Sequence, residues 1–255
     1  MTVEDNEELA EGTLLSHLVE LRSRLFKMFG AVFLVFLALL PFSKIIFNYV
    51  AEPLVSVVPE GELLALSPVS PLTATIALTF YIALFLAMPV ILYQVWAFVA
   101  PGLYRKEKHF TFPLLATSIV LFFVGMAFAY FVVFPLIFGF VSAFTPNTVN
   151  YQPDMTEYVS FVMMVVLVFG LAFETPIATV LLVMTGITTT KKLGKARPYV
   201  FLGAFVIGML LTPPDVISQT MLAVPVYLLF EMGILMSRLV SSKDREPVEE
   251  PEVSP

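Results

Sequence analysis

Residues 72–100 read LTATIALTFYIALFLAMPVILYQVWAFVA, an apolar stretch without a single charged side chain. A helix needs roughly 20 apolar residues to cross a hydrocarbon core of about 30 Å, so this stretch is long enough to span a membrane. On either side of it the charge-free region extends over residues 63–104, and residues 110–153 form a second such region. The sequence therefore predicts several membrane-spanning helices.

The composition supports a membrane protein. Of the 255 residues, 58% are hydrophobic and only 13% are charged, and the mean hydropathy is +0.91. A soluble domain of this size would carry more charge on its surface. The net charge of -6 arises largely in the two tails, and no basic face with interleaved aromatic residues predicts nucleic-acid binding. The chain has no cysteine, which excludes disulfides and thiolate metal sites.

We predict an all-α polytopic membrane protein with six transmembrane helices. The domain covers residues 14–238, between an acidic N-terminal tail (residues 1–13) and a disordered, Pro-, Glu- and Ser-rich cytoplasmic tail (residues 239–255). The acidic start is the reverse of a signal peptide's basic n-region. Pro53 and the prolines after it predict an irregular first loop. The predicted spans are residues 24–42, 72–100, 112–140, 158–184, 199–211 and 216–236.

Several helices are predicted to be kinked or short. Pro89, Pro176 and Pro225 fall inside helical runs, where each removes a backbone hydrogen bond and favours a kink. The fifth run would be only about 20 Å long, and Glu231 interrupts the sixth. Kinked long helices beside two short ones predict a cup-like, concave bundle with local thinning of the bilayer.

The distribution of Lys and Arg predicts the orientation. With six spans, thirteen of the fourteen basic residues fall on the side of the two termini, and only Lys44 falls on the other. The positive-inside rule therefore places both termini in the cytoplasm, as expected for a multi-pass protein of the bacterial inner membrane.

No motif indicates an enzyme. The sequence lacks HExxH, a phosphate-binding GxxxxGK[ST] loop and a carboxylate pair at metal spacing within a span. His17 and His109 lie at the predicted cytoplasmic edge, where interfacial histidines are more common than ligands. We therefore expect no catalytic residue, no cofactor and no metal.

Two carboxylates lie among basic residues. Glu20 is followed four residues later by Arg24, and such an i,i+4 pair is worth only a few tenths of a kcal/mol. Glu107 is the sole acid in the basic segment 105–108, where it could simply balance charge. From spacing alone, either carboxylate could also be a binding group.

A third carboxylate, Glu174, lies inside the fourth predicted span. Facing lipid in its ionised form would cost about 2.5 kcal/mol or more, so Glu174 should face a cavity or partner, or be protonated. Polar contact between helices of the same chain is an equally good interpretation. Asp215 and Gln219 follow a Pro-Pro turn, and Asp215 is an ordinary N-cap residue.

Six short motifs occur in order along residues 14–238. They are SHLxELRxRL (16–25), YQxWxFxxPGLY (93–104) with Glu107, GMAFAYF (125–131), FExP (173–176), RPY (197–199) and LTPPDxxSQ (211–219). Each is weak alone, but together they resemble TatC, the signal-receptor family of the twin-arginine protein translocase.

The resemblance implies a binding site for twin-arginine signal peptides. Glu20 and Glu107 would receive the paired guanidinium groups, each of which can make two parallel charge-assisted hydrogen bonds that a lysine cannot reproduce. Arg22, Leu25 and Phe98 match further positions of the family's recognition surface, and Pro53 matches an important periplasmic-loop position.

The resemblance also implies partners. In the family, the single-span proteins TatA and TatB dock along the fifth and sixth helices. Glu174, Asp215 and Gln219 would form a polar site for a partner helix. The chain would then be a receptor and assembly platform, a homo-oligomer within a complex that exports folded proteins with the proton-motive force.

Three other functions compete with this interpretation. A secondary transporter would show several midplane charges and often internal symmetry, and neither is visible here. A membrane insertase would also use a polar groove, but it would not need a receptor specific for arginine over lysine. An intramembrane protease would need a catalytic dyad, and none is recognisable.

Overall fold

The structure is α-helical, as predicted. The computed structural model describes residues 3–55, 63–99, 111–144, 146, 152–211 and 216–243. The chain forms two compact units, residues 1–170 and residues 171–255. In the described residues the only extended pairing is an isolated parallel bridge between Leu64 and Asp154. The helices are α1 (Val3–Leu39), η1 (Leu40–Phe42), α2 (Ser43–Val55), α3 (Ser70–Val99), α4 (Thr111–Phe128), η4 (Ala129–Val133), α5 (Phe134–Phe144), α6 (Met155–Ala172), α7 (Thr175–Met184), α8 (Thr190–Leu211) and α9 (Val216–Lys243).

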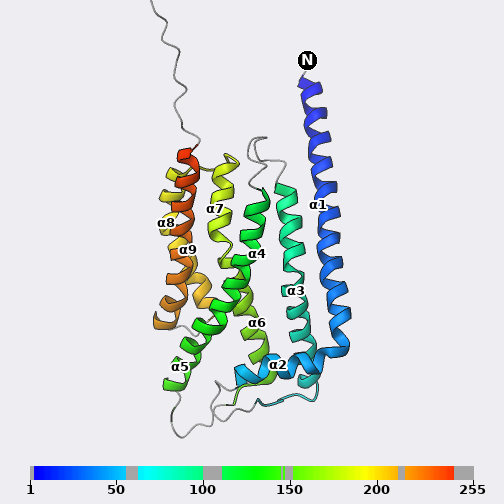
Figure 1. The fold of residues 1–255 in the computed structure, drawn as a ribbon, viewed down its shortest axis with the longest axis vertical. Helices are drawn as coiled ribbons and strands as arrows, with labels where there is room; N and C mark the ends of the chain where they lie inside the picture. The colour runs from blue at the N-terminus through cyan, green and yellow to red at the C-terminus, as the bar shows by residue number, and fades with distance from the viewer. Residues whose placement is uncertain are drawn as a thin grey trace, which may run out of the picture. The chain divides into compact units, whose positions relative to one another are not determined.

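In the first unit, α1 packs along α3. The next helix, α2, lies across the N-terminal end of α3 (Figure 1). Pro41 causes the change of direction, because a proline has no N–H to continue the helical ladder and its ring clashes with the preceding turn. The chain makes one 3₁₀ turn, η1, with Pro41 in its first positions.

One sequence prediction in this unit needs correction. The first loop is not irregular throughout, because residues 43–55, including Pro53, form α2. The predicted acidic N-terminal tail, residues 1–13, is helical from Val3, where α1 begins. Acidic side chains in the first turns of a helix interact favourably with its positive N-terminal end, so they can extend the helix.

The third predicted span contains a wide turn. Between α4 and α5, η4 is a π-helix, and the N–H of Phe134 donates to the carbonyl of Ala129, five residues earlier. Pro135 follows directly and has no backbone N–H to donate. The extra residue in the π turn lets the helix continue past the hydrogen bond that Pro135 cannot make.

The core of the first unit is aromatic. Phe122, Phe134 and Phe169 are each at most 1% exposed. Gly170 permits the close packing of Phe122, because a Cβ at Gly170 would lie 2.7 Å from the Cε2 of that ring. The rings of Phe128 and Phe169 pack with their centroids 5.7 Å apart.

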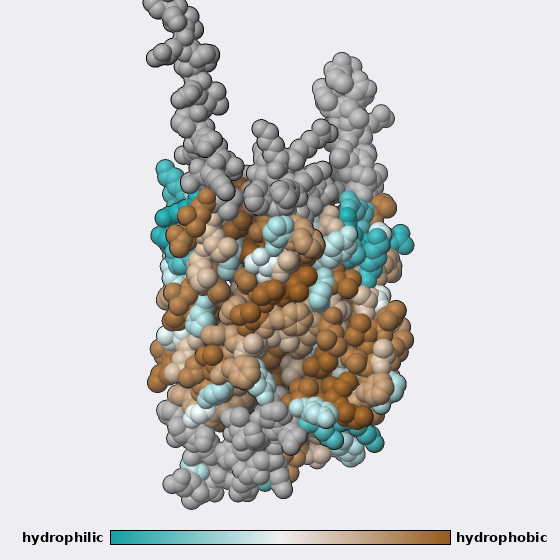
Figure 2. Space-filling model, viewed as in Figure 1, coloured by the Kyte–Doolittle hydropathy of each residue, from teal (hydrophilic) through white to brown (hydrophobic). Residues whose placement is uncertain are grey.

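The outer surface matches a lipid environment. Phe26, Phe29 and Phe33 on α1 are each more than 60% exposed. In Figure 2 the side of the view occupied by α1 is hydrophobic along its middle, with hydrophilic surface above and below. Five helical segments of the described chain are long and apolar enough to cross a membrane: Leu18–Val50, Ser70–Phe98, Phe112–Val141, Met155–Met184 and Gln219–Leu239.

The remaining predicted span lies in α8. This helix begins at Thr190 and its first turns carry Lys191, Lys192 and Lys195, so only residues 199–211 are continuously apolar. The short fifth span is therefore the apolar half of a longer helix.

In the second unit, α7 and α8 both pack against α9. The kink predicted at Pro176 is present as an interruption, since α6 ends at Ala172 and α7 begins at Thr175. The N–H of Glu174 donates to Leu171 O at 3.1 Å within this turn. Pro225, in contrast, lies inside a helix that continues without a break.

Gly233 sets the contact between α7 and α9. A Cβ at this position would overlap Oγ1 of Thr179 and would lie 2.9 Å from Cα of Pro176. The Thr179 hydroxyl donates to Pro176 O at 2.8 Å, so this side chain is held against α9. Helix pairs in membranes use small residues to approach closely, and Gly233 serves that purpose here.

We expect Gly233→Ala to destabilise the protein by roughly 1–3 kcal/mol, because the backbone at Pro176 cannot move aside cheaply. The measurement is thermal denaturation of the detergent-solubilised protein. Gly203→Ala on α8 is the matched control, since its Cβ would meet nothing within 4 Å and alanine is the better helix former. Equal melting temperatures for the two variants would contradict this account of the contact.

The Asp154 carboxylate forms hydrogen bonds with both the loop before α3 and the start of α6. Its Oδ1 accepts hydrogen bonds from the amides of Thr156 at 2.9 Å and Glu157 at 3.1 Å, and Oδ2 accepts from the Leu66 amide at 3.2 Å. The bond from Glu157 is the main reason that the pKa of Asp154 lies below its ordinary value of 3.8. Desolvation opposes this effect, and the Leu66 and Thr156 amides add to it.

A lowered pKa means that the ionised Asp154 carboxylate stabilises the fold at pH values above its unfolded pKa of about 3.9. This contribution is lost as the pH falls through the lower, folded pKa. We expect the melting temperature of the wild type to exceed that of Asp154→Asn at neutral pH, with the difference shrinking as the pH falls below 3.8. A difference that stays constant from neutral pH to pH 3 (roughly one unit below the ordinary pKa) would show that ionisation is not involved.

Candidate functional site

The first candidate site is built on α1. Glu20 and Arg24 lie one turn apart on the same face, and the Nη2 and Nε atoms of Arg24 lie 2.6 Å and 2.9 Å from Oε1 of Glu20. The i,i+4 ion pair predicted from the sequence is therefore present.

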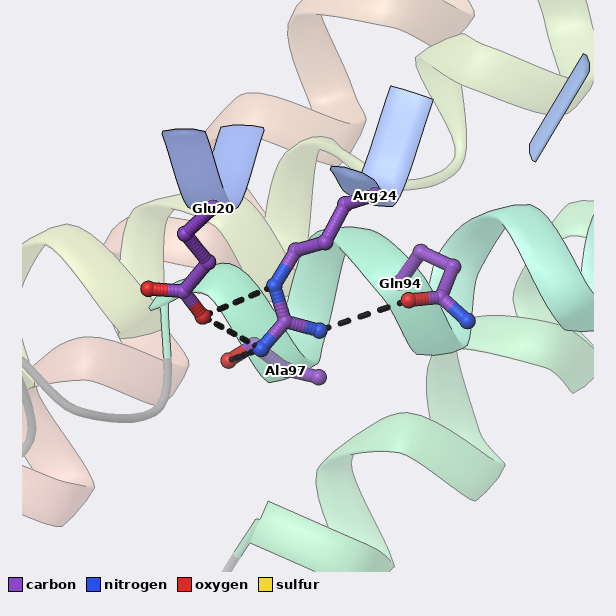
Figure 3. A network of polar contacts seen from close by, with 4 residues as sticks. All are labelled: Glu20, Arg24, Gln94 and Ala97. Carbon is purple, nitrogen blue, oxygen red and sulfur yellow. Dashed lines mark hydrogen bonds and ion pairs between the residues drawn. The ribbon is translucent and has the colours of Figure 1, made fainter. Parts of the chain in front are cut away.

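Arg24 also joins α1 to the end of α3 (Figure 3). Its Nη1 donates to Oε1 of Gln94 at 3.3 Å, and its Nη2 donates to the carbonyl of Ala97 at 3.0 Å. Ala97 is in the last turn of α3, whose carbonyls have no amide partner within the helix. A cation at this position also interacts favourably with the negative end of the helix dipole.

This arrangement leaves part of the Glu20 carboxylate accessible. Both bonds from Arg24 reach the same oxygen, and the second oxygen points away from the guanidinium (Figure 3). The Glu20 side chain is 35% exposed, compared with 18% for Arg24. The site can thus offer a fixed, partly neutralised carboxylate to a second donor.

Other predicted site residues lie nearby in the same unit. The guanidinium carbon of Arg22 lies 5.6 Å from the centre of the Phe26 ring. Leu25 is 39% exposed, and Phe98, next to Ala97 in α3, is half-buried. Glu107 lies outside the described residues.

Two of the residues predicted to form a polar partner site, Glu174 and Gln219, are described by the structure, and they lie on different helices. Glu174 is half-buried at the start of α7, and Gln219 is half-buried in the first turn of α9. The α9 residue opposite Pro176 is Gly233, and Gln219 lies about 21 Å of helix rise before it. Asp215 lies outside the described residues, and for Pro53 only the backbone, within α2, is described.

The backbone of Gln219 packs closely against Gly208 of α8. A Cβ at Gly208 of α8 would lie 3.3 Å from the Gln219 carbonyl oxygen and 3.5 Å from its Cα. The first turn of α9 is therefore pressed against the last turns of α8, at the end of the unit opposite Gly233.

A second charged cluster was not predicted as a site. Arg197 of α8 donates from Nη2 to Oε2 of Glu231 of α9 at 2.7 Å, and its Nε lies 2.7 Å from Oε1. The hydroxyl of Tyr227 donates to the same Oε1 at 2.8 Å. The sequence shows Glu231 only as an interruption of an apolar run, because its partner lies 34 residues away. Among the described residues no group of three or more His, Cys, Asp or Glu side chains could hold a metal ion.

Comparison with known proteins identifies the relatives of the chain. Residues 16–225 match the family model of the Sec-independent protein translocase protein TatC. The TatC of Escherichia coli K12 is 50% identical over 246 residues, which cover 96% of this chain and 93% of that protein. The TatC of Aquifex aeolicus is 39% identical over 235 residues, covering 91% of this chain and 98% of that protein.

A solved structure has the same fold. The crystal structure of a twin-arginine translocase receptor, TatC, superposes with a TM-score of 0.79 at 39% sequence identity. The match covers 88% of this chain and 99% of the other.

Proposed function

This chain belongs to the TatC family of Sec-independent protein translocase proteins, and from this premise we propose that it is the receptor for twin-arginine signal peptides. It is a polytopic membrane protein and a translocase subunit, not an enzyme. The distribution of Lys and Arg supports an inner-membrane location with both termini in the cytoplasm.

The observation that carries the receptor proposal is the geometry of Glu20. Its carboxylate is held at the end of α3 by Arg24 and has one oxygen directed away from that arginine. An incoming guanidinium could approach this oxygen without displacing Arg24. Because Arg24 is itself anchored to Gln94 and Ala97, the carboxylate is positioned before the ligand arrives, which lowers the entropic cost of binding.

Two carboxylates explain a requirement for two arginines. Glu20 would bind one guanidinium, and Glu107, which follows α3 in the sequence, would bind the other. A planar guanidinium makes parallel charge-assisted hydrogen bonds with a carboxylate, whereas a lysine ammonium acts as a point charge. The exposed Leu25 and half-buried Phe98 would contact the apolar part of the signal.

The assembly role concerns the second unit. We propose that the single-span proteins TatA and TatB dock along α8 and α9, and that Glu174 offers a polar contact to one of their helices. A carboxylate within a span is costly against lipid, so a polar partner group would favour docking at this position. Asp215 and Gln219 would lie near the same partner. Copies of the chain would assemble into a complex that exports folded proteins with the proton-motive force.

We expect Glu20→Gln to weaken binding of a twin-arginine peptide by about tenfold, since a charge-assisted hydrogen bond is lost. The measurement is peptide binding to the protein in nanodiscs, with Arg-Arg and Lys-Lys versions of one signal peptide. We expect a similar loss for Glu107→Gln and none for Glu157→Gln, an exposed carboxylate at the opposite end of the first unit.

Equal binding of the Arg-Arg and Lys-Lys peptides would overturn the receptor proposal and favour an insertase or a transporter. Arginine-specific binding that survives both Glu20→Gln and Glu107→Gln would instead retain the receptor but reject these two carboxylates.

We expect Glu174→Ala to reduce co-purification of TatA or TatB with this chain while leaving peptide binding intact. Site-specific crosslinking from α9 to the partner helix measures the contact directly. Glu157→Ala is the control, because this carboxylate lies at the exposed end of α6. If Glu174→Ala assembles and transports like the wild type, Glu174 is a structural polar contact within the chain.

A further inference from the structure

An open pocket of about 500 Å³ lies between α8 and α9 beside the Arg197–Glu231 ion pair. Its lining combines two guanidinium groups and one carboxylate with apolar side chains. The residues that matter for its chemistry are Arg197, Leu228, Glu231, Met232, Leu235 and Arg238.

The polar end of this pocket has an excess of positive charge. Arg197 and Tyr227 together engage both oxygens of Glu231. Arg197 nevertheless remains 42% exposed at its side chain. Arg238 is exposed and lies two helical turns after Glu231, on the same face of α9. The two arginines and one carboxylate leave a net charge of one positive unit, which complements a single phosphate diester.

The apolar end of the pocket forms a track along α9. Leu228, Met232 and Leu235 are each more than 50% exposed. They are spaced four and three residues apart, so they lie on one face of the helix. This face runs from Arg238 back toward the middle of the apolar segment Gln219–Leu239.

The position of the pocket along the two helices corresponds to the membrane–water boundary. Arg197 lies two residues before the apolar run 199–211 of α8. Arg238 is the penultimate residue of the apolar segment of α9. The preceding turns of α8 carry Lys191, Lys192 and Lys195. The pocket therefore lies at the membrane boundary that is rich in basic residues.

We propose that this pocket binds one anionic phospholipid from the leaflet on the basic side. Its phosphate would accept hydrogen bonds from Arg238 and from the remaining donor of Arg197, and one acyl chain would lie along Leu228, Met232 and Leu235. Basic pockets between transmembrane helices on the cytoplasmic side suit lipid headgroups of this kind. The Glu231 ion pair holds Arg197 in place, so the site is formed before the lipid enters. This inference does not depend on the receptor proposal.

The test is native mass spectrometry of the full-length protein released from detergent after titration with phosphatidylglycerol, or with phosphatidylethanolamine of identical acyl chains. We expect the wild type to retain one phosphatidylglycerol in preference to phosphatidylethanolamine. Arg238→Gln should weaken this retention about fivefold, the contribution expected of one basic residue at a membrane surface. Arg238→Lys should keep most of it, which separates loss of charge from misfolding.

Lys27→Gln is the matched control, because it removes one exposed positive charge from α1 without touching the pocket. Equal retention by Arg238→Gln and the wild type, or by Lys27→Gln and Arg238→Gln, would overturn the proposal. Competition by soluble glycerol 3-phosphate at matched concentration would show a free-anion site and would also overturn it. A loss of TatA or TatB from Arg238→Gln, with lipid retention unchanged, would assign the pocket to a protein partner instead.

Discussion

In hydrocarbon, a backbone N–H or C=O without a partner costs several kcal/mol, and this constraint governs where the helices of this chain can bend. Each interruption replaces the missing hydrogen bond locally. After Pro41 the direction changes through a single 3₁₀ turn, and before Pro135 the chain uses a π turn with a Phe134-to-Ala129 bond. Before Pro176, the Glu174 amide bonds to Leu171. Each of these three interruptions therefore retains a local backbone hydrogen bond next to its proline.

The same constraint places charged side chains at the helix ends and in pairs. Arg24 holds Glu20 against the open carbonyl end of α3, and Arg197 holds Glu231 between α8 and α9. Partly exposed pairs like these contribute little to stability. Their effect is to fix the position of a carboxylate or a guanidinium at the membrane boundary. Both proposed sites use that property, the first with a partly free carboxylate and the second with a partly free guanidinium.

The limits of sequence reasoning are visible in particular residues. The apolar runs predicted the spans because lipid imposes a length on each charge-free segment, and Pro176 predicted an interruption that is present. The sequence does not predict the helix at residues 43–55, because Pro53 is typical of a loop, yet this proline lies close to the C-terminal end of α2. The π turn at residues 129–133 has no signature in a uniformly apolar sequence other than the following proline.

The candidate receptor site was partly predictable. The four-residue spacing of Glu20 and Arg24 predicted their ion pair, but the contacts to Gln94 and Ala97 cross about 70 residues of sequence (|i−j| of 70 and 73) and follow only from the packing of α1 on α3. The pair of Arg197 and Glu231 was not anticipated for the same reason. A contact between residues distant in sequence depends on how two helices are rotated about their axes, and uniformly apolar helices give little indication of that rotation.

By itself, the sequence determined the membrane environment, the helical class and the family, because hydrophobic length, charge placement and ordered motifs are properties of the linear chain. Only the tertiary structure decided which oxygen of Glu20 is left available, that Gly233 must be small, and that Arg197 and Arg238 border one pocket. These features depend on distances between helices, and such distances exist only once the side chains of neighbouring helices have packed against one another.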